Sequence, residues 1–138
     1  VYVATDHEDI MAHCKALNMQ VVMTSPDCLT GTDRVAEIAQ KIEADYYINV
    51  QGDEPVIKPQ DIKDVSNAIN KYTGSIINGY APVDDAAMWK SQSVPKVVMR
   101  DDGRLLYMSR APIPGNKSGY FNKAWRQVCV YAYPKAVL

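Results

Sequence analysis

Strand-like and helix-like segments alternate along the first half of the chain, and this alternation constrains its fold more than any other feature. Short apolar runs occupy 1–4, 20–24 and 45–50, and a segment with helical periodicity follows each of them. The clearest helix should be capped by Thr32 or Asp33, because its apolar residues then recur at i, i+3, i+4 and i+7: Val35, Ile38, Ala39 and Ile42. Strands that alternate with helices of this length favour parallel βαβ units. We therefore predict an α/β fold with a Rossmann-like sheet and helices on both of its faces.

Two further helices are expected in the same half of the chain. Thr5 and Glu8 have the spacing of a capping box, so one helix should begin near Thr5. Another should cover 59–72, where apolar residues again recur with helical spacing. We expect the inward faces of adjacent elements to form one core, made of Ile48, Val50, Val35, Ile38 and Ile62.

The pattern changes after residue 74. Four segments are typical of strands, with little helix between them: 76–80, 96–99, 105–108 and 127–133. Asp101-Asp102-Gly103 is a hairpin turn signal, since these residue types tolerate a positive φ. We therefore predict two parts, an α/β part at 1–74 and a smaller strand-rich part at 75–138.

Composition excludes several classes of function. The net charge of −1 provides no long-range field that would attract nucleic acid or an anionic membrane. Three widely spaced cysteines indicate neither a disulfide framework nor a zinc site, which fits a reducing cytoplasm. No transmembrane span or signal peptide is predicted. The strand-like run at 1–4 and the apolar end at Val137-Leu138 lead us to expect that both ends of a longer chain have been cut.

Polar residues follow each predicted strand of the first half. They are Thr5-Asp6, Thr24-Ser25 and Gln51-Gly52-Asp53-Glu54. In open α/β sheets ligands bind beyond the carboxyl ends of the strands, so these residues mark a candidate cleft. Asp6 and Ser25 are better interpreted as cap and turn residues. Asp53 is placed to bind Mg²⁺ while a nucleotide phosphate supplies further oxygen ligands.

Six segments, in this order and at about this spacing, resemble segments of the 3-deoxy-manno-octulosonate cytidylyltransferases, also called CMP-Kdo synthetases. The most specific are 30–37, TGTDRVAE, and 49–55, NVQGDEP. The others are VYVATDHED at 1–9, KVV at 96–98, YMSRAPIP at 107–114 and VYAY at 130–133. The resemblance therefore covers nearly the whole chain. It implies a nucleotide-binding role for 1–74, and sugar binding and dimerisation for 75–138.

The resemblance also implies roles for individual residues. It makes Asp53 a catalytic Mg²⁺ ligand and places three residues near the nucleotide: Gly31, Thr32 and Arg34. It directs Gln51 to the sugar, Arg110 to the anionic ligands and Tyr131 to the sugar acid. Other interpretations stay open for three of them. Arg34 could form an exposed ion pair with Glu37 or Asp33, Arg110 could be a surface cation, and Tyr131 could be a core residue.

The chain departs from the family pattern in three places. The N-terminal strand with its arginine-rich and lysine-containing phosphate loop is absent from this sequence, and so is the C-terminal segment with a second metal-binding aspartate. We therefore expect the 138-residue chain alone to be inactive. Gln127 stands where these enzymes usually carry histidine, and it adds a fourth candidate sugar-binding residue whose chemistry leaves the sugar open.

The predicted reaction is transfer of CMP from CTP to the anomeric hydroxyl of 3-deoxy-manno-octulosonate or a close analogue. Pyrophosphate would be released, Mg²⁺ would be the cofactor, and the product would serve lipopolysaccharide or surface-polysaccharide synthesis. The resemblance further implies a cytoplasmic homodimer joined through the strand-rich part. Two alternatives remain: a cytidylyltransferase for another acidic or amino sugar, and a non-catalytic piece of the same fold.

Overall fold

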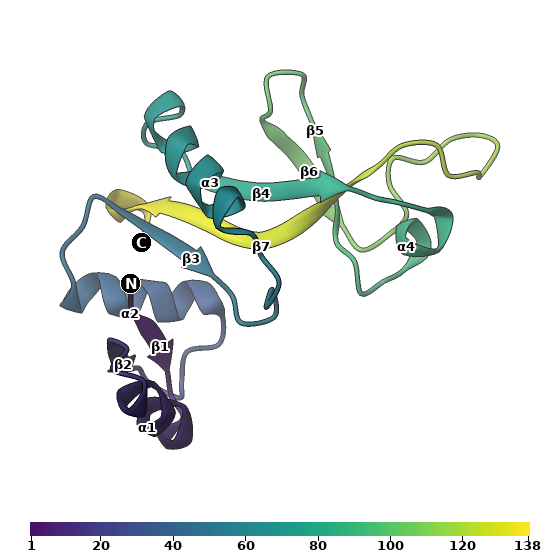
Figure 1. The fold of residues 1–138 in the computed structure, drawn as a ribbon. Coiled ribbons are helices and arrows are strands. Elements are labelled where there is room, and N and C mark those ends of the chain that lie inside the picture. The colour runs from purple at the N-terminus through teal and green to yellow at the C-terminus, as the bar shows by residue number, and fades with distance from the viewer.

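The computed structural model describes residues 1–138, and its strands form two sheets (Figure 1). The smaller sheet has two parallel strands, β1 (Val3–Thr5) and β2 (Val21–Met23), which are connected through helix α1 (Glu8–Ala16). Val3 pairs with Val21, and Thr5 pairs with Met23. A βαβ unit is therefore present at the N-terminal end, as the alternation of segments predicted.

The larger sheet has five strands, and every pair in it is antiparallel. Its members are β3 (Tyr46–Val50), β4 (Ile77–Pro82), β5 (Lys96–Met99), β6 (Leu105–Ser109) and β7 (Trp125–Pro134). The ten-residue β7 is the central element, because it pairs with β3, β4 and β5. It runs through the middle of the sheet, in yellow, in Figure 1.

The α/β class is confirmed, but the position of β3 corrects two expectations. We expected β3 to end at the same edge as β1 and β2 in one parallel sheet. Instead, all five of its residues pair with β7, which satisfies the backbone hydrogen-bonding groups on the edge of β3 that faces β7. The larger sheet therefore crosses the boundary predicted at residue 74. Helix α2 (Gly31–Lys41) contacts both β1 and β3 and so connects the two sheets (Figure 1).

Helix α3 (Pro59–Lys71) begins at Pro59, as the sequence predicted, but α1 and α2 begin at other residues than expected. Helix α1 is capped by His7, whose Nδ1 accepts from the N–H of Asp9 at 3.2 Å. Helix α2 is capped by Thr30 in a reciprocal capping box with Asp33. The cap therefore lies two residues before Thr32, because Asp33 serves as the third residue of this box.

Helix α3 packs on one face of the larger sheet, and a hydrophobic core lies between them. Val65 packs there against Val130 and Ala132, and four partly buried residues surround them: Ile57, Ile69, Ile77 and Val128. Two short helices complete the fold, α4 (Ala86–Lys90) and the 3₁₀ helix η1 (Lys135–Val137). None of the helices has the length and apolar character needed to cross a membrane.

The single core expected from the sequence is wrong in composition. Ile48 and Val50 are 37% and 38% exposed, because α3 packs mainly on β4 and β7 rather than on β3. Val35, Ile38 and Ile62 are only half-buried. The apolar periodicity of α2 and α3 was therefore a correct guide to helix formation, but not to which residues share a core.

A bulge lies between β4 and β7. Asn78 pairs with Tyr131 but Gly79 pairs with Val128, so β7 has two additional residues between these pairs. The side-chain Nδ2 of Asn78 donates to the carbonyl oxygens of Val128 and Val130, at 3.0 and 3.1 Å. A Cβ on Gly79 would lie 2.5 Å from Val130 Cγ1, so only glycine fits at this position.

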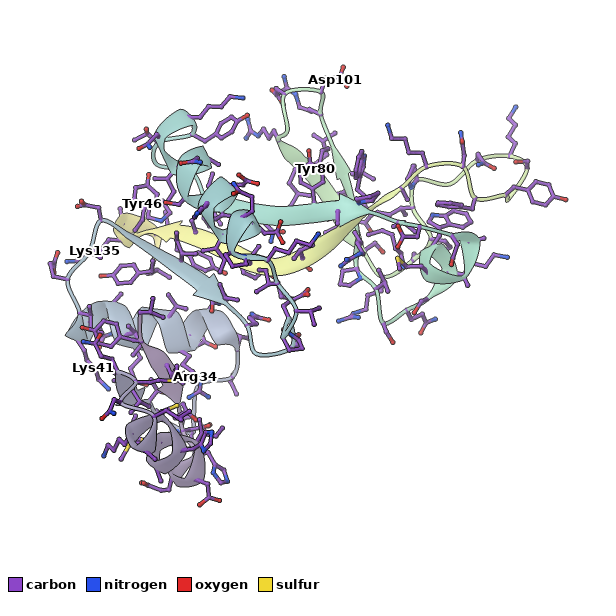
Figure 2. All side chains as sticks on the ribbon, in the orientation of Figure 1. Arg34, Lys41, Tyr46, Tyr80, Asp101 and Lys135 are labelled. Atoms are coloured by element: carbon purple, nitrogen blue, oxygen red, sulfur yellow. The ribbon has the colours of Figure 1, made fainter.

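The predicted hairpin turn is confirmed between β5 and β6. Gly103 has a φ of 87°, in the left-handed region that favours glycine. Its N–H donates to the carbonyl oxygen of Arg100 at 2.9 Å. Asp101 marks the tip of this hairpin in Figure 2.

Glu37 fastens the loop after β2 to helix α2. Its carboxylate accepts from Lys41 Nζ at 2.6 Å and from the backbone N–H of Ser25 at 2.7 Å. These contacts, with Lys41 as the largest cause, lower the pKa of Glu37 from 4.5 to about 2. The negative charge of Glu37 therefore stabilises the loop that leads into α2.

Replacing this carboxylate should change how stability depends on pH. Because the pKa of Glu37 is lower in the folded state, its contribution is complete above pH 4.5 and is lost as the pH falls toward 2. We expect Glu37→Gln to lower the Tm of the full-length protein at neutral pH, and the two Tm curves to converge in acid. Circular dichroism melts over this pH range measure the effect. Glu8→Gln, at an exposed position, is the control. Parallel curves for wild type and Glu37→Gln would contradict the assignment.

Candidate functional site

One face of the β3–β7 pair presents polar and aromatic side chains to helix α2. Asn49 lies directly opposite Tyr131 in the register, and the N–H of Gln51 donates to the carbonyl oxygen of Cys129 at 3.2 Å. Because side chains alternate along a strand, these residues share a face with others on β7. We call this surface the polar face; it consists of Asn49, Gln51, Gln127, Cys129, Tyr131 and Tyr133.

The first turn of α2 lies against the polar face. Thr32 Oγ1 is 3.2 Å from the hydroxyl oxygen of Tyr133. Gly31 lies beside the side chains of Gln51 and Asn49. The fold thus brings together three predicted site residues that are distant in sequence from Tyr131, namely Gly31, Thr32 and Gln51.

Asp53 lies at the edge of the polar face, in the turn after β3, and is exposed. It interacts with Cys129 on β7. Burial raises the pKa of the Cys129 thiol, and the carboxylates of Asp53 and Glu54 raise it further. Glu54 also accepts from the N–H of Cys129 at 3.3 Å, so the acidic turn is attached to the strand.

Tyr131 occupies the middle of the polar face. Burial, together with the neighbouring Cys129, Tyr133 and Asp53, raises the pKa of its hydroxyl to about 12. The hydroxyl is therefore neutral at physiological pH and can still donate a hydrogen bond. Gln127 Nε2 donates to this hydroxyl, and the ring of Tyr131 stacks on that of Tyr133 with centroids 5.6 Å apart.

Arg34 lies on α2 and contacts residues at the ends of β1 and β2. Its position is labelled in Figure 2. Its guanidinium donates to the hydroxyl of Thr24 and forms an ion pair with Asp6 at 3.0 Å. This contact is the largest cause of the lowered pKa of Asp6. The partner is thus neither Glu37 nor Asp33, because the former binds Lys41 and the latter caps the helix.

Arg110, like Arg34, is a predicted site residue that does not lie on the polar face. It is exposed, and its guanidinium donates to the carbonyl oxygen of Gln92 at 2.8 Å. Its own carbonyl oxygen accepts from Lys96 Nζ at 2.6 Å. Lys96 is completely buried and also donates to Ser91, so it anchors the segment that contains Arg110.

Three residues of the polar face were not singled out from the sequence: Asn49, Cys129 and Tyr133. Cys129 and Tyr133 share the alternating positions of Gln127 and Tyr131 on one strand, and this period of two was the signal that could have found them. Asn49 has a buried Nδ2 without a hydrogen-bond partner, which only the structure reveals.

No group of three or more His, Cys, Asp or Glu side chains in the structure could hold a metal ion. A single carboxylate at the polar face still fits Mg²⁺, which often takes only one or two protein carboxylates together with substrate phosphates and water. The exposed carboxylate of Asp53 offers one such oxygen ligand. Its neighbour Glu54 is engaged with the backbone of β7.

Comparison with known proteins identifies the family to which this arrangement belongs. The family described as cytidylyltransferase matches residues 1–136. The chain belongs to the cytidylyltransferase family. The resemblance stated from the sequence segments is therefore confirmed.

Several cytidylyltransferases are similar to the chain over its whole length. Proteins named 3-deoxy-manno-octulosonate cytidylyltransferase include one from Protochlamydia amoebophila, 39% identical over 95% of this chain and 54% of its own length. Another, from Escherichia coli, is 35% identical over 100% of this chain and 56% of its own length. The chain thus spans about half the length of these cytidylyltransferases.

A solved structure has the same fold. It is described as CMP:2-keto-3-deoxy-manno-octonic acid synthetase complexed with CTP, and it is 34% identical to this chain with a TM-score of 0.91. The similarity covers 99% of this chain and 57% of that one. The cytidylyltransferase fold of this chain is therefore established over both of its sheets.

Proposed function

We propose that the full-length protein transfers CMP from CTP to the anomeric hydroxyl of 3-deoxy-manno-octulosonate or a close analogue. The observation that carries this proposal is the polar face, with Gln51, Asp53 and Tyr131 gathered beside the first turn of α2. It lies in a cytidylyltransferase chain that closely resembles a synthetase solved with CTP.

In this reaction the anomeric oxygen of the sugar attacks the α-phosphorus of CTP. A phosphorus–oxygen bond to the sugar forms, the bond from the α-phosphorus to the bridging oxygen breaks, and pyrophosphate leaves. The hydroxyl proton passes to solvent. Most of the rate in such a displacement comes from positioning and charge stabilisation, so the chain needs no covalent nucleophile.

The nucleotide would lie beside the first turn of α2. Helix N-termini expose backbone N–H groups that bind phosphate oxygens, and here that end consists of Gly31 and Thr32. Arg34 adds a positive charge one turn further along. Asp53 would hold Mg²⁺, which when bound would neutralise part of the phosphate charge.

The sugar acid would lie over β7. Tyr131 keeps a neutral hydroxyl that can donate to a carboxylate or hydroxyl oxygen, and Gln51, on the same polar face, makes hydrogen bonds only through its backbone. Arg110 donates to the carbonyl oxygen of Gln92 and would reach this ligand only if its loop approached the polar face.

A second candidate function rests on Gln127. Its Nε2 donates to Tyr131, so its Oε1 is left as an acceptor. An acceptor at this point favours a sugar that presents an amine or another donor. The alternative substrate is therefore an amino-substituted or otherwise modified 3-deoxy-ulosonic acid. With either substrate, the reaction would take place in the cytoplasm and its product would serve the synthesis of lipopolysaccharide or another surface polysaccharide.

Dimerisation through the strand-rich part is also a proposal. Strand β6 pairs only with β5, and its apolar side chains are exposed: Leu105, Leu106, Tyr107 and Met108. An unpaired edge with apolar residues is a site for association. Sedimentation equilibrium of the full-length protein would reveal a monomer if this proposal is wrong.

The proposed reaction is tested directly by incubating the full-length protein with CTP, Mg²⁺ and 3-deoxy-manno-octulosonate. We expect pyrophosphate and the CMP-sugar to form in equal amounts. The same assay with an amino-substituted analogue separates the two candidate substrates. Absence of product from every 3-deoxy-ulosonic acid would reject the enzymatic function and leave the non-catalytic alternative.

Asp53→Asn tests the metal ligand. The substitution keeps the shape of the side chain but removes its charge, so we expect an unchanged Tm and a kcat lower by at least about 100-fold. Steady-state kinetics of the full-length enzyme measure the effect. Asp84→Asn, at an exposed position, is the control. A kcat within about twofold of wild type would remove Asp53 from the metal site.

Gln127→His tests sugar selection. Histidine can carry charge and donates from a different position, whereas Gln127 is neutral and leaves an acceptor oxygen free. We expect the ratio of kcat/KM for the amino-substituted analogue over 3-deoxy-manno-octulosonate to fall by about tenfold in the variant. Competition kinetics with both sugars measure this ratio. Equal ratios for the two proteins would show that Gln127 does not select the substrate.

A further inference from the structure

The contact between Gly31 and Gln51 is closer than any side chain at residue 31 would allow. A Cβ on Gly31 would lie 2.8 Å from Gln51 Nε2 and 3.5 Å from its Cδ. It would also lie 3.7 Å from Asn49 Nδ2, which is an ordinary contact. The amide of Gln51 thus occupies the space that a side chain would fill.

The backbone does not explain the glycine. Three glycines of the chain have a positive φ, namely Gly74, Gly103 and Gly119, and Gly31 is not among them. Gly31 is the first residue of α2, where alanine is more favourable than glycine. Folding alone would therefore accept alanine at this position, and what glycine permits is the close approach of the Gln51 amide.

Gln51 is held in place only by its surroundings. Its hydrogen bonds are made by its backbone, with the N–H donating to Cys129 and the carbonyl oxygen accepting from Glu54. The side-chain amide is thus free to meet a ligand, and its position depends on what packs beside it. A methyl group on Gly31 would push this flexible amide aside without moving the strand.

We propose that Gly31 is a positioning residue for the sugar, which acts by leaving space for the Gln51 amide. This inference rests on the proposed function, in which Gln51 contacts the sugar acid. It differs from the role that the family resemblance gives to Gly31, which is contact with the nucleotide. The start of α2 then serves both substrates, the sugar through Gln51 and the nucleotide through its backbone.

Gly31→Ala in the full-length enzyme tests the inference, with CTP and 3-deoxy-manno-octulosonate as substrates. We expect the KM for the sugar to rise by about tenfold and the KM for CTP to stay within about twofold of wild type. The Tm should be unchanged or higher, because alanine favours the helix. Gly115→Ala is the matched control, since a Cβ on Gly115 would meet nothing within 4 Å.

A double-mutant cycle shows whether Gly31 acts through Gln51. Gln51→Ala removes the amide, so adding Gly31→Ala to it should cause no further loss of kcat/KM for the sugar. If the two substitutions instead lower kcat/KM for the sugar by independent factors that multiply in the double variant, the inference is wrong. It is also wrong if Gly31→Ala raises only the KM for CTP or has no effect. If the wild-type enzyme forms no CMP-sugar, the proposed function fails first and this inference falls with it.

Discussion

The pairing of β7 with three other strands is the constraint on which the rest of the structure depends. Because side chains alternate along β7, its odd-numbered and even-numbered residues face opposite sides of the sheet. Val130 and Ala132 are buried under α3, while Tyr131 and Tyr133 face α2 across the polar face. A single strand therefore places the hydrophobic core and the candidate site back to back, and a shift by one residue would exchange them.

The elements of the fold could be predicted from local sequence, because helical periodicity, caps and turn residues act over a few positions. Helices α2 and α3 and the hairpin at Asp101 were found in this way. The pairing of β3 with β7 could not be found, since about 80 residues separate them and backbone hydrogen bonds carry no information about sequence. The same limit explains why Ile48 and Val50 were wrongly expected to be buried.

The candidate site was predictable to a similar extent. Gln51 and Asp53 follow a strand, where ligands bind in α/β sheets, and the structure brings Gln51 to Gly31 and Cys129. Asn49 was missed because a polar residue inside a strand has no local signature of a site. Arg34 was paired with the wrong carboxylates, because its true partner, Asp6, is close only once β1 and α2 pack together.

The bulge beside Gly79 makes the two edges of β7 differ. The edge that pairs with β4 already contains a register shift, whereas the edge that pairs with β3 has none. The side-chain amide of Asn78 satisfies the β7 carbonyls that lose their regular backbone partners there, while the register with β3 continues without interruption. Insertions or deletions between β4 and β7 can therefore be absorbed on the β4 side. The strand-rich region can thus change in length without disturbing the alternation of side chains that builds the polar face.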